Sequence, residues 1–300
     1  MQLRNKEIFI FGGSGFVGQN LIEGIIGDNY QIRVLVRNKE EKELLERRGV
    51  KAVIGDVLEL NTFLNEIEEN SVIFYLIHGL SWQKEKANLL DIEERAVDNL
   101  IRAAKIKKAR QIIHLTGIYF EEQKLSPHFL ARKLTLEKIK NSGIPFTILR
   151  TSIIFGKGSI SFEIIKNIIL KIPLLPIFKW SKSRVSPIHV DDVVLALTKT
   201  IQNPAFFNKI IDIGGPEIFS YDILLKKVAK FLKLKRIFIN LPLSPFYLPA
   251  LFAAYSTGFS IREVYFLFQS LKNDCFCSPD QFKKFFGVEP KSIFDKKLFK

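Results

Sequence analysis

A glycine-rich turn near the start of the chain most narrows what this sequence can fold into. It reads Gly12-Gly13-Ser14-Gly15-Phe16-Val17-Gly18, with a short apolar run before it and an amphipathic stretch after it. A glycine turn between a strand and a helix is typical of a loop that binds a dinucleotide pyrophosphate, because unpaired N–H groups and the helix dipole attract the anion. A glycine-rich turn without a ligand is the alternative interpretation.

Short apolar runs alternate with longer helical stretches through the first half of the chain. The runs are rich in β-branched and aromatic residues and are mostly continuous, as are strands buried on both faces of a parallel sheet. They occupy residues 8–12, 32–36, 51–56, 71–77, 111–116 and 145–151. We therefore predict an α/β fold, a doubly wound parallel Rossmann sheet with helices on both faces, which binds ligands at the carboxyl ends of its strands.

In the second half of the chain, apolar runs and helical stretches alternate less regularly. Its composition predicts helices over 160–171, 190–202 and 220–233, the last with Ser220 as N-cap, and a strand over 210–215. We expect residues 1–155 to form the cofactor-binding core. Residues 156–300 are expected to form a smaller substrate or lid lobe, interleaved with the core as one structural unit.

Residues 237–261 form a long uncharged run. Three prolines and several small polar residues interrupt it, so we predict a buried or substrate-covering segment rather than a transmembrane helix. Contact with a membrane surface remains an open alternative, which the basic character of the chain favours.

The end of the second predicted strand bears on the choice of dinucleotide. An acid about 20 residues after the glycine loop would bind the ribose 2′-hydroxyl of NAD. Arg37 stands there instead, with Lys39 close behind. A guanidinium suits the 2′-phosphate of NADP, so the sequence favours NADP(H), with NAD(H) still possible. A solvated surface arginine is the alternative.

Two further strand ends predict cofactor contacts. Asp56 and Val57 follow the third strand, where a carboxylate can accept a hydrogen bond from the adenine amino group. A helix cap or a local turn around Asp56 is the alternative. Ile77, His78 and Gly79 follow the fourth strand, at the expected edge of the cofactor cleft.

Composition narrows the compartment and the partners. The chain is 47% hydrophobic and 25% charged, the balance of a globular protein. Cys275 and Cys277 are too few for a disulfide framework or a tetrahedral zinc site, so we predict reduced core or lid residues, no metal and a cytoplasmic location. The net charge of +14 is spread along the chain without a basic block or a nucleic-acid motif, so no nucleic-acid partner is expected.

Several motifs resemble the atypical, extended short-chain dehydrogenase/reductase superfamily. The glycine loop, VLVRN and GDVLELNTF are similar to its cofactor half. TILRTSIIFGKGS, SPIHVDDVVLAL and IIDIGGPEIFSYDILL are similar to its second half. YLIHGL, LSPHFLARK and SLKNDCFC resemble a bacterial group of NAD(P)H-binding proteins, with NmrA-like regulators and a complex I accessory subunit as more distant relatives. The resemblance implies the Rossmann fold but no particular substrate.

The same resemblance exposes a departure in the catalytic pattern. Active members carry Tyr-x-x-x-Lys, in which the tyrosine exchanges a proton and the lysine holds the nicotinamide ribose. Here Lys133 is present, but Phe129 occupies the tyrosine position. The resemblance also implies that Thr116 supplies a hydrogen-bonding hydroxyl to the site. It places three residues beside the nicotinamide: Thr151, Ser152 and Ile153.

Two groups could replace the missing acid. Lys133 either acts as acid or base itself, or only holds the cofactor. His128 could donate a proton near neutral pH, or could simply begin a helix after Pro127. The remaining histidines, His114 and His189, are interpreted as structural.

Two functions compete on these grounds. The first is an NADPH-dependent oxidoreductase acting on an apolar acceptor such as a quinone or carbonyl. The second is a non-catalytic NADPH-binding sensor or assembly subunit with a protein partner, which Phe129 favours. A nucleotide-sugar epimerase fits least, because it normally needs the tyrosine. The sequence leans towards the oxidoreductase but does not decide whether the chain is an enzyme.

Overall fold

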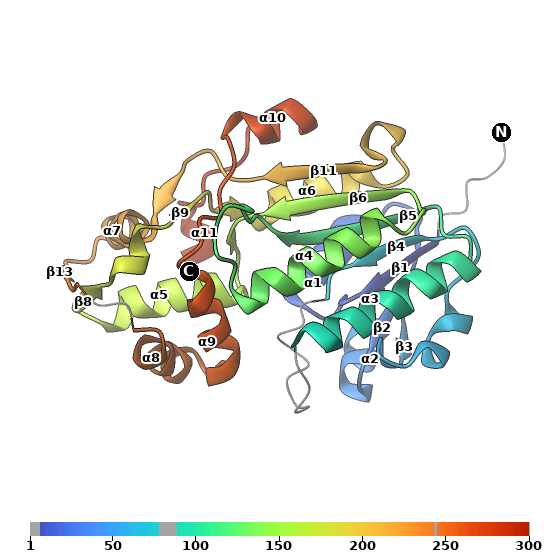
Figure 1. Ribbon diagram of the computed structural model, residues 1–300, viewed down its shortest axis with the longest axis horizontal. Helices are drawn as coiled ribbons and strands as arrows, with labels where there is room; N and C mark the ends of the chain where they lie inside the picture. Colours follow the sequence, from blue (N-terminus) through green and yellow to red (C-terminus); the bar gives the residue numbers. More distant parts are fainter. Residues whose placement is uncertain (1–6, 78–88, 243–244, 300) are drawn as a thin grey trace. The chain divides into compact units, whose positions relative to one another are not determined.

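A seven-stranded sheet is the centre of the computed structural model, which describes residues 7–77, 89–242 and 245–299 (Figure 1). The strand order is β11-β6-β5-β4-β1-β2-β3. Their bounds are β1 Glu7–Phe11, β2 Gln31–Val36, β3 Lys51–Ile54, β4 Val72–Tyr75, β5 Gln111–Gly117, β6 Phe146–Thr151 and β11 Lys209–Ile213. The pairs β1–β2, β1–β4, β2–β3 and β4–β5 are parallel. The predicted doubly wound α/β fold is therefore confirmed.

From β1 the chain adds β2 and β3 on one side of the sheet, and then crosses to add β4 on the other side of β1. This is the topological switch point, where open α/β sheets bind ligands beyond the carboxyl ends of the strands. Every residue of β1 and β4 is buried, as their continuous apolar sequences predict. Aromatic side chains fill one face of the sheet here, with Phe9, Phe11, Phe63 and Tyr75 in a single core cluster.

Helices cover both faces of the sheet (Figure 1). α3 (Leu89–Ile106) and α4 (Pro127–Lys140) contribute to the aromatic core cluster of one face. α1 (Phe16–Ile25) packs on the other face with α6 (Val190–Thr200), where a side-chain atom on Gly24 would meet Val194. α2 (Lys39–Glu46) follows β2, and two short 3₁₀ helices, Leu60–Thr62 and Leu64–Glu66, follow β3.

Contacts divide the chain into two compact units that alternate along the sequence. The first unit comprises residues 1–116, 130–150 and 194–211, and the second comprises residues 117–129, 151–193 and 212–300. Both units draw on the N-terminal and C-terminal parts of the chain. The predicted division of roles at residue 155 stays a prediction.

The second unit is built from helices and short strands. Three two-stranded pairs join β7 (Ile154–Phe155) to β10 (Ile188–His189), β9 (Arg184–Val185) to β12 (Phe219–Ser220) and β8 (Leu174–Ile177) to β13 (Ile237–Asn240). The helices are α5 (Ile160–Lys171), α7 (Tyr221–Phe231), α8 (Tyr247–Thr257), α9 (Ile261–Ser270), α10 (Asp280–Phe286) and α11 (Lys296–Phe299), with 3₁₀ turns at Lys179–Lys182 and, in the first unit, Pro204–Phe206. The helix predicted over 160–171 is confirmed.

Two local predictions need correction or completion. Ser220 occupies the N-cap position of α7, but its hydroxyl bonds the Asp222 carboxylate instead of a backbone N–H. Within residues 237–261 lie β13 and α8, which expose Ile237, Tyr247 and Tyr255, so the prediction of a buried segment is wrong for these side chains. No described helix is long and apolar enough to cross a membrane.

Candidate functional site

The glycine loop joins β1 to α1 by backbone contacts that exclude side chains. Gly12 has a φ of +86°, and a Cβ there would lie 2.9 Å from the carbonyl carbon of Leu76. A Cβ on Gly18 would lie 2.3 Å from the carbonyl oxygen of Gly12, so the first turn of α1 rests directly on the loop. Only glycine permits both approaches, and the loop is held against the end of β4.

The N-terminus of α1 carries a positive end that neither its cap residue nor its first turn neutralises. Its N-cap, Gly15, offers no side-chain bond, and the first turn contains no acidic residue. The Gly15 N–H donates to Gly12 O at 3.2 Å, and the first helical bond runs from Gln19 N to Gly15 O at 2.9 Å. The intervening amides of Phe16, Val17 and Gly18 have no helical acceptor, so this end suits a phosphate group.

The segment after β2 is held by the cap of α2. Asn38 Oδ1 accepts the Glu41 N–H at 2.8 Å, and the backbone N–H of Arg37 donates to Glu41 Oε2 at 3.2 Å. The side chains of Arg37 and Lys39 are exposed. The backbone of Arg37 is thus fixed at the carboxyl end of the strand next to the loop.

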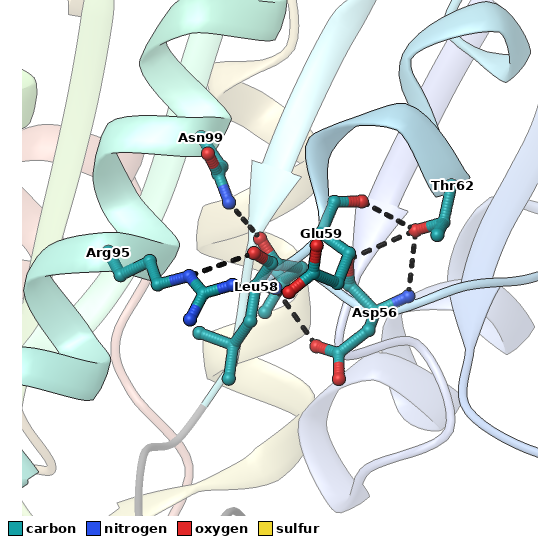
Figure 2. Close-up of polar contacts among 7 residues, drawn as sticks. Asp56, Leu58, Glu59, Thr62, Arg95 and Asn99 are labelled. Atoms are coloured by element: carbon teal, nitrogen blue, oxygen red, sulfur yellow. Dashed lines mark hydrogen bonds and ion pairs between the residues drawn. The ribbon is translucent and has the colours of Figure 1, made fainter. Parts of the chain in front are cut away.

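Asp56 lies in a compact turn after β3 (Figure 2). Its Oδ1 accepts the Leu58 N–H at 2.9 Å, which is the local turn named as an alternative from the sequence. Its backbone N–H donates to Thr62 Oγ1 at 3.0 Å. Among the described residues, Oδ2 has no hydrogen-bond donor, so one carboxylate oxygen shapes the turn and the other can accept a further bond.

Two side chains of α3 hold this turn from the other side, as Figure 2 shows. Arg95 Nε donates to Leu58 O at 3.1 Å and its guanidinium pairs with the Glu59 carboxylate. Asn99 Nδ2 donates to Val57 O at 2.9 Å. Neither residue is predicted from the sequence. They lie four positions apart on one helix face, a spacing that gives no signal without the fold.

A buried polar cluster lies at the ends of β4 and β5. Tyr75 and His114 are paired neighbours whose ring centroids are 5.4 Å apart. His114 Nδ1 donates to Tyr75 O at 2.8 Å, and Arg132 Nη1 of α4 donates to Ile77 O at 3.1 Å. Four buried atoms in this region have no hydrogen-bond partner among the described residues. They are Tyr75 Oη, His114 Nε2, Thr116 Oγ1 and Arg132 Nη2.

Burial sets the ionisation of this cluster. It lowers the pKa of His114 to about 3, and the nearby Arg132 charge adds to the decrease. Burial also raises the pKa of Tyr75 well above its ordinary value, with a smaller contribution from Glu93. His114 is therefore neutral and Tyr75 protonated near pH 7. The cluster can hydrogen-bond a group at the strand ends, and the predicted structural role of His114 now includes holding the β4 backbone.

Phe129 and Lys133 lie on the same helix, α4. Phe129 is buried in the core cluster of the second unit, where its ring contacts Gly117 and lies 6.4 Å from the Tyr119 ring. Its neighbour His128 is also buried, in the first turn of the helix. Lys133 belongs to the first unit and is half-buried. The position at which the resemblance expects a catalytic tyrosine is thus filled by a core-packing ring.

The predicted nicotinamide segment, Thr151 to Ile153, belongs to the second unit. Thr151 has a buried hydroxyl without a partner among the described residues. Ser152 Oγ donates to Cys275 O at 2.5 Å and accepts the Ser186 N–H at 3.1 Å. The carbonyl of Ile153 accepts the Ile188 N–H at 3.0 Å. The hydroxyl of Ser152 therefore ties three distant segments together.

The two cysteines make further hydrogen bonds among the segments that Ser152 joins. Ser186 Oγ accepts the Cys277 N–H at 3.2 Å, and Cys275 Sγ donates to Thr151 O at 3.6 Å. Both thiols are reduced and buried, as predicted, and burial raises the pKa of Cys275 to about 12. His189 accepts the Asp191 N–H through Nδ1 at 3.1 Å, which agrees with its structural interpretation. His78 and Gly79 lie outside the described residues.

A comparison with models of protein families identifies the family of the chain. A family model described as NAD(P)H-binding matches residues 12–168, just over half of the chain. The chain belongs to this NAD(P)H-binding family. The match begins at the glycine loop and continues through α4, β6 and most of α5, so it spans both Gly12 and Lys133. Its relatives also confirm the resemblance to the atypical short-chain dehydrogenase/reductase superfamily.

Curated relatives of this NAD(P)H-binding chain include assembly factors and reductases. The photosystem II assembly factor Ycf39 of Cyanophora paradoxa is 26% identical over 144 residues, which cover 48% of this chain and 44% of that protein. The ceramide reductase of Caulobacter vibrioides is 23% identical over 197 residues, 66% of this chain and 61% of that protein. The chain therefore spans about half the length of these relatives.

Solved structures of the same fold cover nearly the whole NAD(P)H-binding chain. The triphenylmethane reductase of Citrobacter sp., complexed with NADP(H), has a TM-score of 0.74 at 18% identity and covers 96% of this chain and 97% of that one. A nucleoside-diphosphate-sugar epimerase of Staphylococcus aureus has a TM-score of 0.74 at 16% identity and covers 98% and 100%. At this identity the likeness concerns the fold.

Proposed function

We propose that this NAD(P)H-binding chain is an NADPH-dependent oxidoreductase that reduces an apolar acceptor such as a quinone or carbonyl. One observation carries the proposal: the glycine loop keeps the close backbone approaches at Gly12 and Gly18 that only glycine permits. A buried phenylalanine stands where the resemblance expects the proton donor, so the acceptor should need little acid assistance. A quinone accepts a hydride readily and needs less acid assistance than an ordinary carbonyl. The reductases among the relatives support the same reaction class.

The residues proposed to contact the cofactor lie mainly at the carboxyl ends of the strands. The amides of Gly12 to Gly18 would hold the pyrophosphate, and Arg37 with Lys39 would hold the 2′-phosphate of NADP. Asp56 would accept the adenine amino group through its open oxygen. The remaining proposed contacts are Val57, Ile77, His78, Gly79, Thr116, Lys133, Thr151, Ser152 and Ile153. NADP(H) in the Citrobacter sp. neighbour supports the preference over NAD(H).

When bound, NADPH supplies the hydride. The overall reaction joins NADPH, one proton and a quinone to give NADP⁺ and the quinol. Thr116, whose buried hydroxyl has no partner among the described residues, would donate a hydrogen bond within the site. Lys133 would hold the nicotinamide ribose and deliver the proton to the reduced oxygen. We place the protein in the cytoplasm, with residues 156–300 contributing the apolar acceptor site.

Single-turnover oxidation of bound NADPH tests this proposal. The absorbance of NADPH is followed against a panel of quinones and apolar carbonyls, with NADH as the alternative cofactor. Lys133→Ala should slow the oxidation at least tenfold. Lys140→Ala is the matched control, because Lys140 is exposed, lies on the same helix and pairs with the half-buried Glu137. Oxidation that is equally fast in Lys133→Ala contradicts its assigned role.

A non-catalytic NADPH-binding assembly or sensor role is the second candidate. The burial of Phe129 in the proton-donor position favours it, and so does the similarity to Ycf39, an assembly factor by name. Tight NADPH binding without oxidation by any acceptor would support this role. Affinity purification with and without NADPH would then look for a partner protein whose binding depends on the cofactor.

A further inference from the structure

The second unit exposes an apolar surface on two neighbouring elements. The first is the pair of strands β8 and β13, in which Ile237 is opposite Leu174 and Ile239 opposite Pro176. Leu175 and Ile177 point into the core. Leu174, Ile237 and Ile239 are instead 51%, 65% and 42% exposed. One face of this small sheet is therefore apolar and open to solvent.

The second element is helix α8. Its alanines, Ala250, Ala253 and Ala254, face the core of the unit. Tyr247, Leu251 and Tyr255 recur every four residues, so they form a single stripe on the helix surface. They are 60%, 46% and 90% exposed, and Phe252 beside them is 43% exposed. A surface helix normally turns polar residues outward, but α8 carries apolar or aromatic residues on its exposed face as well as on its core face.

Both elements meet at the C-terminal end of α5. Lys171 Nζ donates to Ser256 O at 2.5 Å, which attaches the C-terminal end of α8 to the C-terminal end of α5. Arg236 donates to Ile169 O at 2.7 Å and to Leu170 O at 3.1 Å, which attaches β13 to the same end. Figure 1 shows β8, β13 and α8 around this helix. We call the exposed residues of these elements the apolar surface.

The sequence segments that carry the apolar surface contain basic residues and no acid. Residues 164–184 contain five basic residues and no acid, and residues 223–261 contain six basic residues and no acid. Some pair with acids elsewhere in the unit, as Lys182 does with Asp222. Lys171, Lys235 and Arg236, next to the apolar surface, have no carboxylate partner among the described residues.

We propose that the apolar surface binds an anionic phospholipid bilayer. The exposed aliphatic and tyrosine side chains would enter the interfacial region, where amphipathic aromatic rings are favoured. The lysines and Arg236 would meet the lipid phosphates. The two sequence segments that carry the apolar surface contain basic residues and no acid, which favours a uniformly anionic partner over a protein surface of mixed charge. This inference does not depend on the proposed reductase activity.

Cosedimentation of the full chain with vesicles tests the inference. Vesicles of phosphatidylcholine with phosphatidylglycerol should bind the chain, and phosphatidylcholine alone should bind it much more weakly. The double variant Ile237→Ser with Tyr255→Ser should weaken binding at least tenfold, because two interfacial side chains are lost. Lys235→Ala should weaken it about fivefold, and raised salt should do the same.

Two control variants test whether vesicle binding depends on the apolar surface or on the general apolarity and charge of the chain. Val288→Ser removes a 41% exposed apolar side chain elsewhere in the second unit, and Lys284→Ala removes an exposed lysine of α10. Both should bind vesicles as the parent does. The proposal is overturned if the chain ignores anionic vesicles, or if the controls and patch variants lose binding equally. It is also overturned if the patch variants abolish self-association while vesicle binding is unchanged. NADPH oxidation is measured separately, so either proposal can fail alone.

Discussion

The glycine loop and the start of α4 differ in what they retain. At the loop, Gly12 and Gly18 stand where any side chain would collide with backbone within 3 Å. At the start of α4, the position that usually carries a proton donor holds Phe129, packed into a core. Under the proposed function, cofactor binding and proton transfer would depend on separate parts of the chain, since Gly12 and Phe129 belong to different units. One can be kept while the other is replaced by packing.

The largest effect is expected at the loop itself. In Gly18→Ala, the added Cβ would lie 2.3 Å from Gly12 O, so the loop must shift. A misplacement of about 1 Å can cost ~10²-fold, so we expect NADPH affinity to fall about a hundredfold. Fluorescence titration measures the affinity, and thermal melting checks the fold. Gly27→Ala is the control, because a Cβ there meets nothing within 4 Å. Unchanged NADPH affinity in Gly18→Ala would refute the assigned loop.

At the start of α4, a substitution is expected to increase the rate of carbonyl reduction. Phe129→Tyr restores a hydroxyl to the position of the usual acid. Reduction of apolar carbonyls should then rise about 10²-fold, whereas quinone reduction should change little. Phe129→Leu keeps the site apolar and should show no gain. If Phe129→Tyr reduces carbonyls no faster than the parent, then the position does not correspond to the catalytic tyrosine.

The buried histidine predicts a pH effect on stability rather than on activity. The pKa of His114 is about 3 in the folded chain, compared with 6.5 in the unfolded chain. Between these values the unfolded chain binds the proton and the folded chain does not, so stability falls as the pH falls below 6.5. The slope from this residue is about 1.4 kcal/mol per pH unit. The free energy of unfolding, measured with urea from pH 7 to about pH 5, should depend less steeply on pH in His114→Gln than in the parent.

Arg37 tests the choice of cofactor. Its exposed guanidinium lies at the carboxyl end of β2, where it could meet a 2′-phosphate. Arg37→Ala should reduce NADPH affinity about tenfold and leave NADH affinity unchanged. Arg47→Ala, which removes an exposed arginine at the end of α2, should alter neither. Equal losses for both cofactors would mean that Arg37 does not distinguish them.

The sequence predicted the features that depend on local pattern. The main strands and the glycine loop are visible because burial on both faces and close backbone approach each demand particular residues. The two-residue strands of the second unit have no such pattern. Contacts across long separations were also hidden, as when Ser152 bonds Cys275 O or when Arg95 bonds Leu58 O. Such contacts depend on the folded arrangement of segments that no spacing rule connects.

The smallest effect is expected at the turn around Asp56. Arg95→Ala removes the hydrogen bond to Leu58 O and the pairing with Glu59, but Asn99 still holds Val57 O. An exposed bond of this kind contributes about 1 kcal/mol, so the turn should loosen without unfolding. NADH and NADPH share the adenine group, and both affinities should therefore fall by a similar factor of about two to five. Arg102→Ala, an exposed arginine of the same helix, should leave both unchanged. A loss confined to NADPH would instead assign Arg95 to the 2′-phosphate, and would remove the distinction drawn between the adenine contact at Asp56 and the phosphate contact at Arg37.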